Sequence, residues 1–351
     1  MLGHKSGVTG VAFNCTGTLV ASSSSDGTVQ VWSTACLEAG AKPLRTLVGH
    51  RAGVHCIAFD PLDPDRLASG SQDQRLIIWS ISESASKLKL VSNDHKGVHS
   101  VSFSPKHPGV LAAGQAGGGV QVVDSTNGEV LAVLATRGTV HATAFSQAGL
   151  LATGDSGTVA LWSIPSGKEK LTIPDCHEGP VTALAFCASG ARLASASSED
   201  KTVVVSCVKT GAAKMRIQAE CNLRSVAWWS IGVLATGGSD GVLRLWDDVG
   251  GDLLQELRGH SGEICSAEFH PGEECALVTG GADTTVKRWR IENVLTRREK
   301  LRFALLGCVG YARDLEGKEE GKALEEVIVR TALLPDDLVR YLIEFVGAGI
   351  V

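Results

Sequence analysis

The chain is built from short runs of apolar and small residues that are separated by turn-forming residues. Residues 8–13 and 19–22 predict two short strands, and residues 28–32 alternate polar and apolar side chains, as a third strand does. Between the second and third strands, Ser25-Asp26-Gly27 predicts a hairpin turn, because Gly supplies a positive φ and Asp tolerates one. Residues 44–47 supply a fourth strand. The pattern therefore predicts a four-stranded antiparallel unit.

This unit recurs along the chain with the same residue types in the same order. Its closing positions are 39 to 47 residues apart, at Trp32, Trp79, Val123, Trp162, Ser206, Trp246 and Trp289. Three copies carry Gly-His at their start, at Gly3-His4, Gly49-His50 and Gly259-His260. Four weaker copies start at Asp94-His95, Thr136-Arg137, Cys176-His177 and Glu220-Cys221. A period of this length with Gly-His and a closing Trp is typical of a propeller blade.

On these residues the chain resembles the WD-repeat family over about residues 1–306. The resemblance implies an all-β fold, a seven-bladed β-propeller of four-stranded antiparallel blades. A linker over 307–322 and a short α-helical extension over 323–351 are expected to follow. The resemblance further implies that a His, a Ser or Thr, an Asp and a Trp form a hydrogen-bonded structural tetrad inside a blade. The implied tetrads are His4, Ser22, Asp26 and Trp32; His50, Ser69, Asp73 and Trp79; and His260, Thr279, Asp283 and Trp289.

Composition narrows the class of protein further. An apolar content of 44% is ample for a repeat core, and a net charge of −5 without a dense Lys/Arg run argues against nucleic acid or an anionic membrane as partner. Ten cysteines without a Cys-x-x-Cys pair favour a reducing compartment, either cytoplasmic or nuclear. No secretory signal or membrane-spanning run is evident.

Enzyme motifs are not found. The sequence has no phosphate-binding loop, no paired zinc ligands and no dinucleotide fingerprint, so we expect no catalytic residue, no metal and no cofactor. The recurring His, Asp and Ser leave a hydrolase as an alternative. Their repetition beside a Trp, without a Gly-x-Ser-x-Gly elbow, favours a structural role. The principal expectation is a non-catalytic scaffold for protein–protein interaction.

One strand position carries candidate binding residues. In the WD-repeat family, partners commonly bind the face formed by the loops that enter the innermost strands. The second position of that strand reads, unit by unit, Thr9, His55, His99, His141, Thr182, Arg224 and Cys265. Histidine can donate hydrogen bonds, titrate near neutrality or bind metal. We therefore hypothesise a partner-binding mouth lined by His55, His99, His141, Thr182 and Arg224. The alternative is that these side chains are separately solvated.

The C-terminal residues offer a second hypothesis. Apolar positions at helical spacing after Pro335 predict one apolar face, and residues 334–345 resemble the end of a SOCS box or the start of an F-box. The resemblance implies a substrate receptor of a cullin-type ubiquitin ligase whose adaptor contacts the tail; the alternative is a helical cap on the propeller. The candidate adaptor-binding residues are Leu334, Pro335, Leu338, Tyr341, Leu342 and Phe345.

Overall fold

A computed structural model describes residues 3–36, 41–91, 97–229, 232–272 and 276–291 of the chain. The described residues all belong to the first of two units into which the chain divides after Val294. The predicted linker over 307–322 and the helical extension over 323–351 lie outside these residues.

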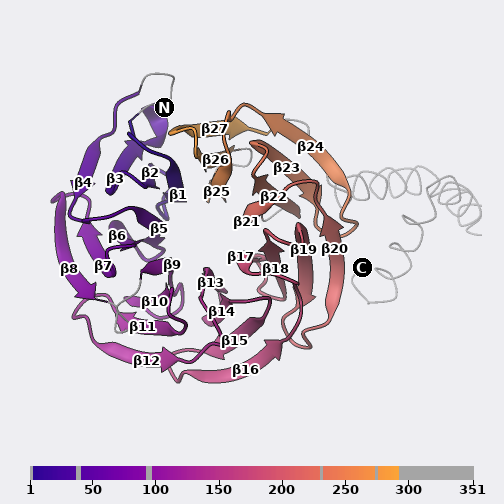
Figure 1. The fold of residues 1–351 in the computed structure, drawn as a ribbon. Coiled ribbons are helices and arrows are strands. Elements are labelled where there is room, and N and C mark those ends of the chain that lie inside the picture. The colour runs from indigo at the N-terminus through magenta and orange to yellow at the C-terminus, as the bar shows by residue number, and fades with distance from the viewer. Residues whose placement is uncertain (1–2, 37–40, 92–96, 230–231, 273–275, 292–351) are drawn as a thin grey trace, which may run out of the picture. The chain divides into compact units, whose positions relative to one another are not determined.

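The described strands form seven antiparallel sheets that follow one another around a ring (Figure 1). Within each sheet, consecutive strands are hydrogen-bonded neighbours in chain order, with the first strand innermost. This is a seven-bladed β-propeller of all-β class. Six blades have four strands, and the described part of the seventh has three.

The first three blades contain twelve strands and one short 3₁₀ helix, Thr34–Cys36. Blade 1 comprises β1 (Val8–Phe13), β2 (Leu19–Ser24), β3 (Thr28–Ser33) and β4 (Arg45–Val48). Blade 2 comprises β5 (Val54–Asp60), β6 (Asp63–Ser71), β7 (Arg75–Ser80) and β8 (Ala85–Val91). Blade 3 comprises β9 (Val98–Phe103), β10 (Val110–Gln115), β11 (Val120–Asp124) and β12 (Val130–Leu134).

The other four blades repeat the arrangement. Blade 4 comprises β13 (Ala142–Phe145), β14 (Leu150–Gly154), β15 (Val159–Ser163) and β16 (Lys168–Ile173). Blade 5 comprises β17 (Val181–Phe186), β18 (Arg192–Ser197), β19 (Thr202–Cys207) and β20 (Ala213–Gln218). Blade 6 comprises β21 (Leu223–Trp229), β22 (Val233–Gly238), β23 (Val242–Asp247) and β24 (Leu253–Arg258). Blade 7 comprises β25 (Ile264–Phe269), β26 (Ala276–Gly281) and β27 (Val286–Arg290).

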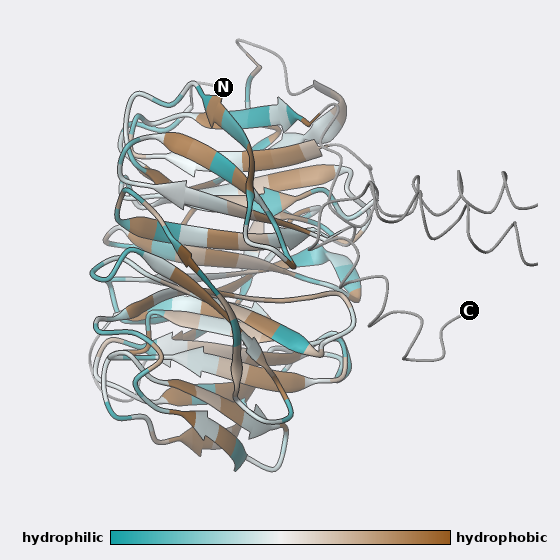
Figure 2. Ribbon diagram, turned by 90° about the vertical axis from the view of Figure 1, so that its right-hand side faces the viewer, coloured by the Kyte–Doolittle hydropathy of each residue, from teal (hydrophilic) through white to brown (hydrophobic). Residues whose placement is uncertain are grey.

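The hydrophobic core lies between the blades. Seven clusters of buried side chains each combine residues of two neighbouring sheets, including one between blades 7 and 1. Figure 2 shows the blades edge-on, with much of the hydrophobic colour in the strands and much of the hydrophilic colour in the loops. A blade therefore buries its apolar faces only in the presence of both neighbours, which makes the ring the cooperative unit.

Both faces of the middle strands are buried, including their polar positions. The alternation at residues 28–32 correctly predicts a strand, β3, in which Val29, Gln30 and Val31 are all buried. The side-chain amide of Gln30 donates from Nε2 to the Gly3 carbonyl oxygen at 2.9 Å. Polar residues in these middle strands thus lie within inter-blade interfaces.

The ring closes where the first inner strand packs against the last. In addition to the apolar cluster between blades 7 and 1, two side chains of β25 accept backbone N–H groups of β1. Ser266 Oγ accepts from Val11 at 3.1 Å, and Glu268 Oε2 accepts from Phe13 at 3.0 Å. These bonds join residues about 255 positions apart.

Candidate functional site

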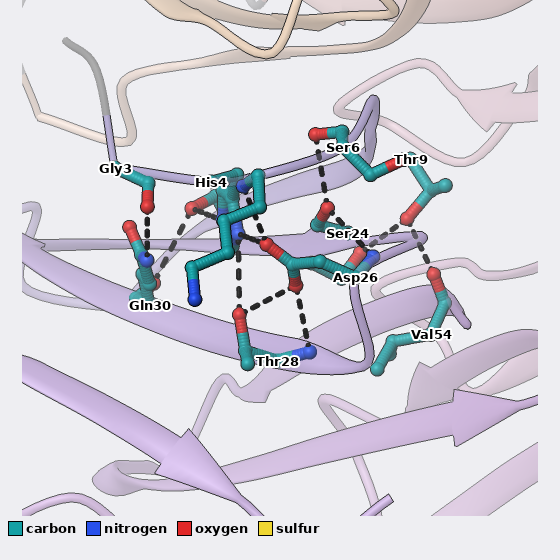
Figure 3. A network of polar contacts seen from close by, with 12 residues as sticks. Gly3, His4, Ser6, Thr9, Ser24, Asp26, Thr28, Gln30 and Val54 are labelled. Carbon is teal, nitrogen blue, oxygen red and sulfur yellow. Dashed lines mark hydrogen bonds and ion pairs between the residues drawn. The ribbon is translucent and has the colours of Figure 1, made fainter. Parts of the chain in front are cut away.

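The residues of the first implied tetrad are hydrogen-bonded in series. Figure 3 shows two of them, His4 and Asp26, beside Thr28. His4 Nδ1 lies 3.2 Å from Asp26 Oδ2, and His4 Nε2 lies 2.8 Å from Ser22 Oγ. The indole N–H of Trp32 donates to the same hydroxyl at 3.0 Å. A hydroxyl on the second strand thus joins the ring of the loop histidine to the indole of the third strand.

The second and seventh blades have the same arrangement. His50 contacts Asp73 at 3.1 Å and Ser69 at 2.7 Å, and Trp79 donates to Ser69 at 2.7 Å. In blade 7, His260 contacts Asp283 at 2.9 Å and Thr279 at 2.7 Å, and Trp289 donates to Thr279 at 2.8 Å. The hydroxyl residue is fully enclosed in these blades, because Ser22, Ser69 and Thr279 are each 0% exposed.

Proton placement within a tetrad follows from charge. Burial lowers the pKa of His260 despite the opposing contacts of Asp283, so the ring is neutral at pH 7. Burial raises the pKa of Asp283, but hydrogen bonds from Thr285, the Ser261 N–H and His260 outweigh it and bring the pKa to about 2. An ionised carboxylate only accepts. Nδ1 of the histidine therefore carries the proton, and Nε2 accepts from the hydroxyl.

The other blades keep part of the network. Blade 5 places His177 at 2.9 Å from Asp200 and 2.8 Å from Ser195, with Ser206 in place of the Trp. Blade 4 keeps the bond from Trp162 to Thr153 at 3.0 Å.

Blade 6 contains a buried arginine network that the sequence did not predict. It has Cys221 in place of the tetrad histidine, and buried Arg244 of β23 pairs with Asp240 at 2.7 Å and Glu256 at 3.0 Å. The arginine comes from the middle strand, whereas the histidine comes from the loop, so the repeat alignment does not reveal the exchange.

The candidate partner-binding residues lie at the start of the inner strands. The rings of His55 and His99 have centroids 4.9 Å apart, and those of His99 and His141 are 5.5 Å apart. We call these three residues, from blades 2, 3 and 4, the histidine row. The structure thus brings together three side chains that are each more than forty positions apart in the sequence.

In blades 1, 5 and 6, the residue equivalent to the row histidines bonds to the neighbouring blade. We call this end of the inner strands the rim. Thr9 donates to the Val54 carbonyl oxygen at 2.6 Å (Figure 3), and Thr182 donates to that of Leu223 at 2.9 Å. Both threonines therefore tie one blade to the next. Arg224 is exposed, and its Nε donates to Glu263 at 2.8 Å. Its charge also contributes to lowering the pKa of His141, so the guanidinium lies within electrostatic reach of the row.

Metal-binding and membrane-spanning features are the other kinds of site to consider in this fold. Among the described residues, no cluster of three or more His, Cys, Asp or Glu side chains has the arrangement to hold a metal ion. Within the same part of the chain, no helix is both long and apolar enough to cross a membrane. The candidate adaptor-binding residues, Leu334 to Phe345, lie outside the described part, so the ligase hypothesis stays a prediction.

These features define a repeat protein of the propeller class, with polar networks inside the blades and a histidine-lined mouth. A family model described as WD domain, G-beta repeat matches residues 1–33, 41–80, 168–205, 216–247 and 251–290. Because the matches cover about half of the chain, it belongs to this family. The unmatched stretch 81–167 contains blade 3 and the first three strands of blade 4.

Curated relatives match at low identity. One is "Cell division cycle 20.5, cofactor of APC complex" of Arabidopsis thaliana, 31% identical over 142 residues, or 40% of this chain and 31% of the relative. Another is "Nuclear distribution protein nudF" of Aspergillus niger, 24% identical over 290 residues, or 82% of this chain and 59% of the relative. A third is "Histone acetyltransferase type B subunit 2" of Candida glabrata, 24% identical over 153 residues, or 41% of this chain and 36% of the relative. The matches span less than two thirds of these relatives' lengths.

Proposed function

We propose that the protein is a non-catalytic platform that assembles partner proteins on the propeller face bearing the histidine row. The observation that carries this proposal is the histidine row itself: three half-buried residues at the start of β5, at the start of β9 and immediately before β13, whose neighbouring ring centroids lie 4.9 and 5.5 Å apart. Such a surface offers hydrogen-bond donors and aromatic faces to an extended peptide or an exposed helix. Membership of the WD-repeat family supports a scaffold role.

The rigidity of the ring favours binding at this face. Seven inter-blade cores and the bonds of Thr9 and Thr182 hold the inner strands in place before a partner arrives. Because little backbone freedom remains at these positions, docking there costs less conformational entropy than docking on an unstructured loop.

The hydrolase alternative has little physical support in the tetrads. Their order of Asp, His and hydroxyl is that of a catalytic triad. However, the hydroxyl of Ser22 is fully buried and also accepts a bond from Trp32, so no substrate carbonyl can approach it. The network repeats in blades 2 and 7, as expected for residues that hold a blade together.

Affinity capture with matched variants tests the proposal. Wild-type protein and the triple variant His55→Thr, His99→Thr, His141→Thr are used as baits, with His107→Thr as control. His107 lies between β9 and β10, at the opposite end of β9 from His99. Proteins captured by wild type are then purified and titrated against each bait. We expect the triple variant to lose them and the control to retain them. Equal binding to all three baits, with melting temperatures unchanged, contradicts the proposal.

A further inference from the structure

A second set of charged side chains lies beside the histidine row and was not singled out from the sequence. In blades 1, 2, 5 and 7, the residue after the tetrad histidine donates its backbone N–H to the turn aspartate. In blade 4, Arg137, which the repeat alignment places at the histidine position itself, makes the same bond, and the five distances are 2.8 to 3.2 Å. These residues are Lys5, Arg51, Arg137, Glu178 and Ser261. The shared bond shows that they occupy one structural position, so their side chains can be compared blade by blade.

The charge at this position changes around the ring. Blades 1, 2 and 4 present exposed Lys5, Arg51 and Arg137, which we call the basic arc. Blade 5 presents exposed Glu178, and its neighbouring turn presents exposed Glu199. One side of the face is therefore basic and the next sector is acidic, although the chain as a whole carries a net charge of −5.

The basic arc and the histidine row lie at the same end of the inner strands. Arg51 precedes His55 by four residues and Arg137 precedes His141 by four residues, which limits each separation along the backbone to about 14 Å. Together with Arg224, these groups surround part of the mouth with hydrogen-bond donors and positive charge.

We propose that the histidine row, the basic arc and Arg224 bind an acidic segment of a partner protein, through carboxylate groups placed at the mouth. This inference rests on the proposed function and specifies the chemistry of the partner. Arginine and lysine bind carboxylates by charge-assisted hydrogen bonds. The three imidazoles add donors at the centre of the site.

The distribution of charge favours a short acidic peptide over nucleic acid. A nucleic acid strand carries evenly spaced negative charge and is repelled by an acidic sector on the same face. Glu178 and Glu199 form such a sector next to the basic arc. A protein segment can place its acidic residues over blades 1 to 4 and neutral or basic residues over blade 5, which makes the two sectors complementary to one polar sequence.

Binding of carboxylates at this mouth is coupled to protons. Burial lowers the pKa of all three histidines, and positive charge on His99, His141 and Arg224 lowers the pKa of His55, His99 and His141 respectively. Among the described residues, the same end of the strands also carries the turn carboxylates of Asp26, Asp73 and Asp155, which accept the backbone N–H groups of the basic arc. It carries Glu263, paired with Arg224, and the thiols of Cys56 and Cys265, whose pKa values burial raises to about 12 and about 11. The histidines are therefore the groups that gain protons below pH 6.5. A bound carboxylate favours their charged form, so affinity rises as pH falls.

Peptide display tests the inference directly. Random twelve-residue peptides are selected on the full chain at pH 5.5 and pH 7.5, and selected peptides are synthesised and titrated. The test proteins are wild type, His55→Gln/His99→Gln/His141→Gln, and Lys5→Gln/Arg51→Gln/Arg137→Gln, with His107→Gln as the matched control. Melting temperatures confirm that each variant is folded.

We expect selected peptides to be rich in Asp and Glu and to bind wild type at least tenfold more tightly at pH 5.5 than at pH 7.5. The histidine variant should lose this pH dependence, the basic-arc variant should bind about tenfold more weakly at both pH values, and the control should match wild type. Peptides that need the histidine row but show no acidic excess overturn the inference and leave the proposed function standing. Acidic peptides that bind both triple variants normally also overturn it. So does an oligothymidylate that binds the row more tightly than any selected peptide.

Discussion

The tetrad of blade 2 gives a prediction whose size can be worked out from the structure. Ser69 Oγ accepts from Trp79 and donates to His50, both at 2.7 Å, and all of these atoms are removed from solvent. The substitution Ser69→Ala leaves the indole N–H and the imidazole Nε2 without their partner. Each buried polar group that loses its partner costs about 1–3 kcal/mol, so for the two groups we expect a loss of about 2–6 kcal/mol in the free energy of unfolding.

Blade 5 supplies the matched control. Ser195 occupies the same position and contacts His177 at 2.8 Å, but Ser206 replaces the Trp, so Ser195→Ala affects no indole. It removes the partner of the imidazole and a longer bond of 3.4 Å to the Val204 carbonyl oxygen, and the expected loss is about 1–3 kcal/mol. The difference between the two variants, about 1–3 kcal/mol, measures the contribution of the Trp79 bond. Neither variant changes the outer surface, because both serines are buried.

Urea unfolding of the two variants, followed by far-UV circular dichroism and by tryptophan fluorescence, measures the difference. Coincident curves from the two probes are needed before a free energy is taken from the midpoints. In a protein that already carries Trp79→Phe, the substitution Ser69→Ala should cost less than it does in wild type, because no indole N–H is left without a partner. The reasoning is refuted if Ser195→Ala costs as much as Ser69→Ala, or if Ser69→Ala costs less than about 0.5 kcal/mol, within the surface-substitution range.

Three further predictions concern titratable groups. Burial raises the pKa of Glu268 to about 8, so the stability contributed by its protonated form is present at low pH and is lost as pH rises from about 4.5 through 8. The free energy of unfolding of Glu268→Gln should therefore exceed that of wild type by about 1–4 kcal/mol at pH 9 and be similar to it at pH 5. Equal stability of the two proteins at pH 9 argues against this prediction. Burial lowers the pKa of His4, His50, His177 and His260, so their contribution to stability should decline as pH falls below 6.5. Asp283, with a pKa of about 2, should add a second decline in stability below about pH 4. Melting temperatures measured from pH 7 to pH 3 check both pH ranges. Hydrogen bonds from Thr210 and Lys209 lower the pKa of Cys207 to about 7, so iodoacetamide at pH 7 should modify Cys207 before Cys56 or Cys176, with Cys207→Ser as the control for peptide mapping.

The number of blades could be predicted from the sequence because the repeat fixes residue types at fixed offsets. Gly49-His50, Ser69, Asp73 and Trp79 reappear as Gly259-His260, Thr279, Asp283 and Trp289, and these residues form the same hydrogen bonds in both blades. Their agreement follows from local geometry, since all four residues lie within one sheet and its entering loop. Periodicity alone was less informative for β3, where inter-blade packing buries Gln30 as well as its apolar neighbours.

Interactions between repeats could not be predicted in the same way. The bond from Phe13 to Glu268 joins the first inner strand to the last, and nothing in either segment indicates the other. The exchange of a loop histidine for Arg244 in blade 6 was missed for a related reason, because the replacement comes from another strand. The basic arc became visible only when the shared N–H bonds to the turn aspartates aligned the entering loops.

Amide hydrogen exchange of the protein alone and bound to a captured partner is the most direct test of the binding face. A partner seated on the histidine row should slow exchange in the loops at 49–55 and 136–141 and at the start of β9, and leave the turns at the opposite ends of β5, β9 and β13 unchanged. Protection confined to those opposite turns, or to the outer strands β4, β8 and β12, contradicts the account.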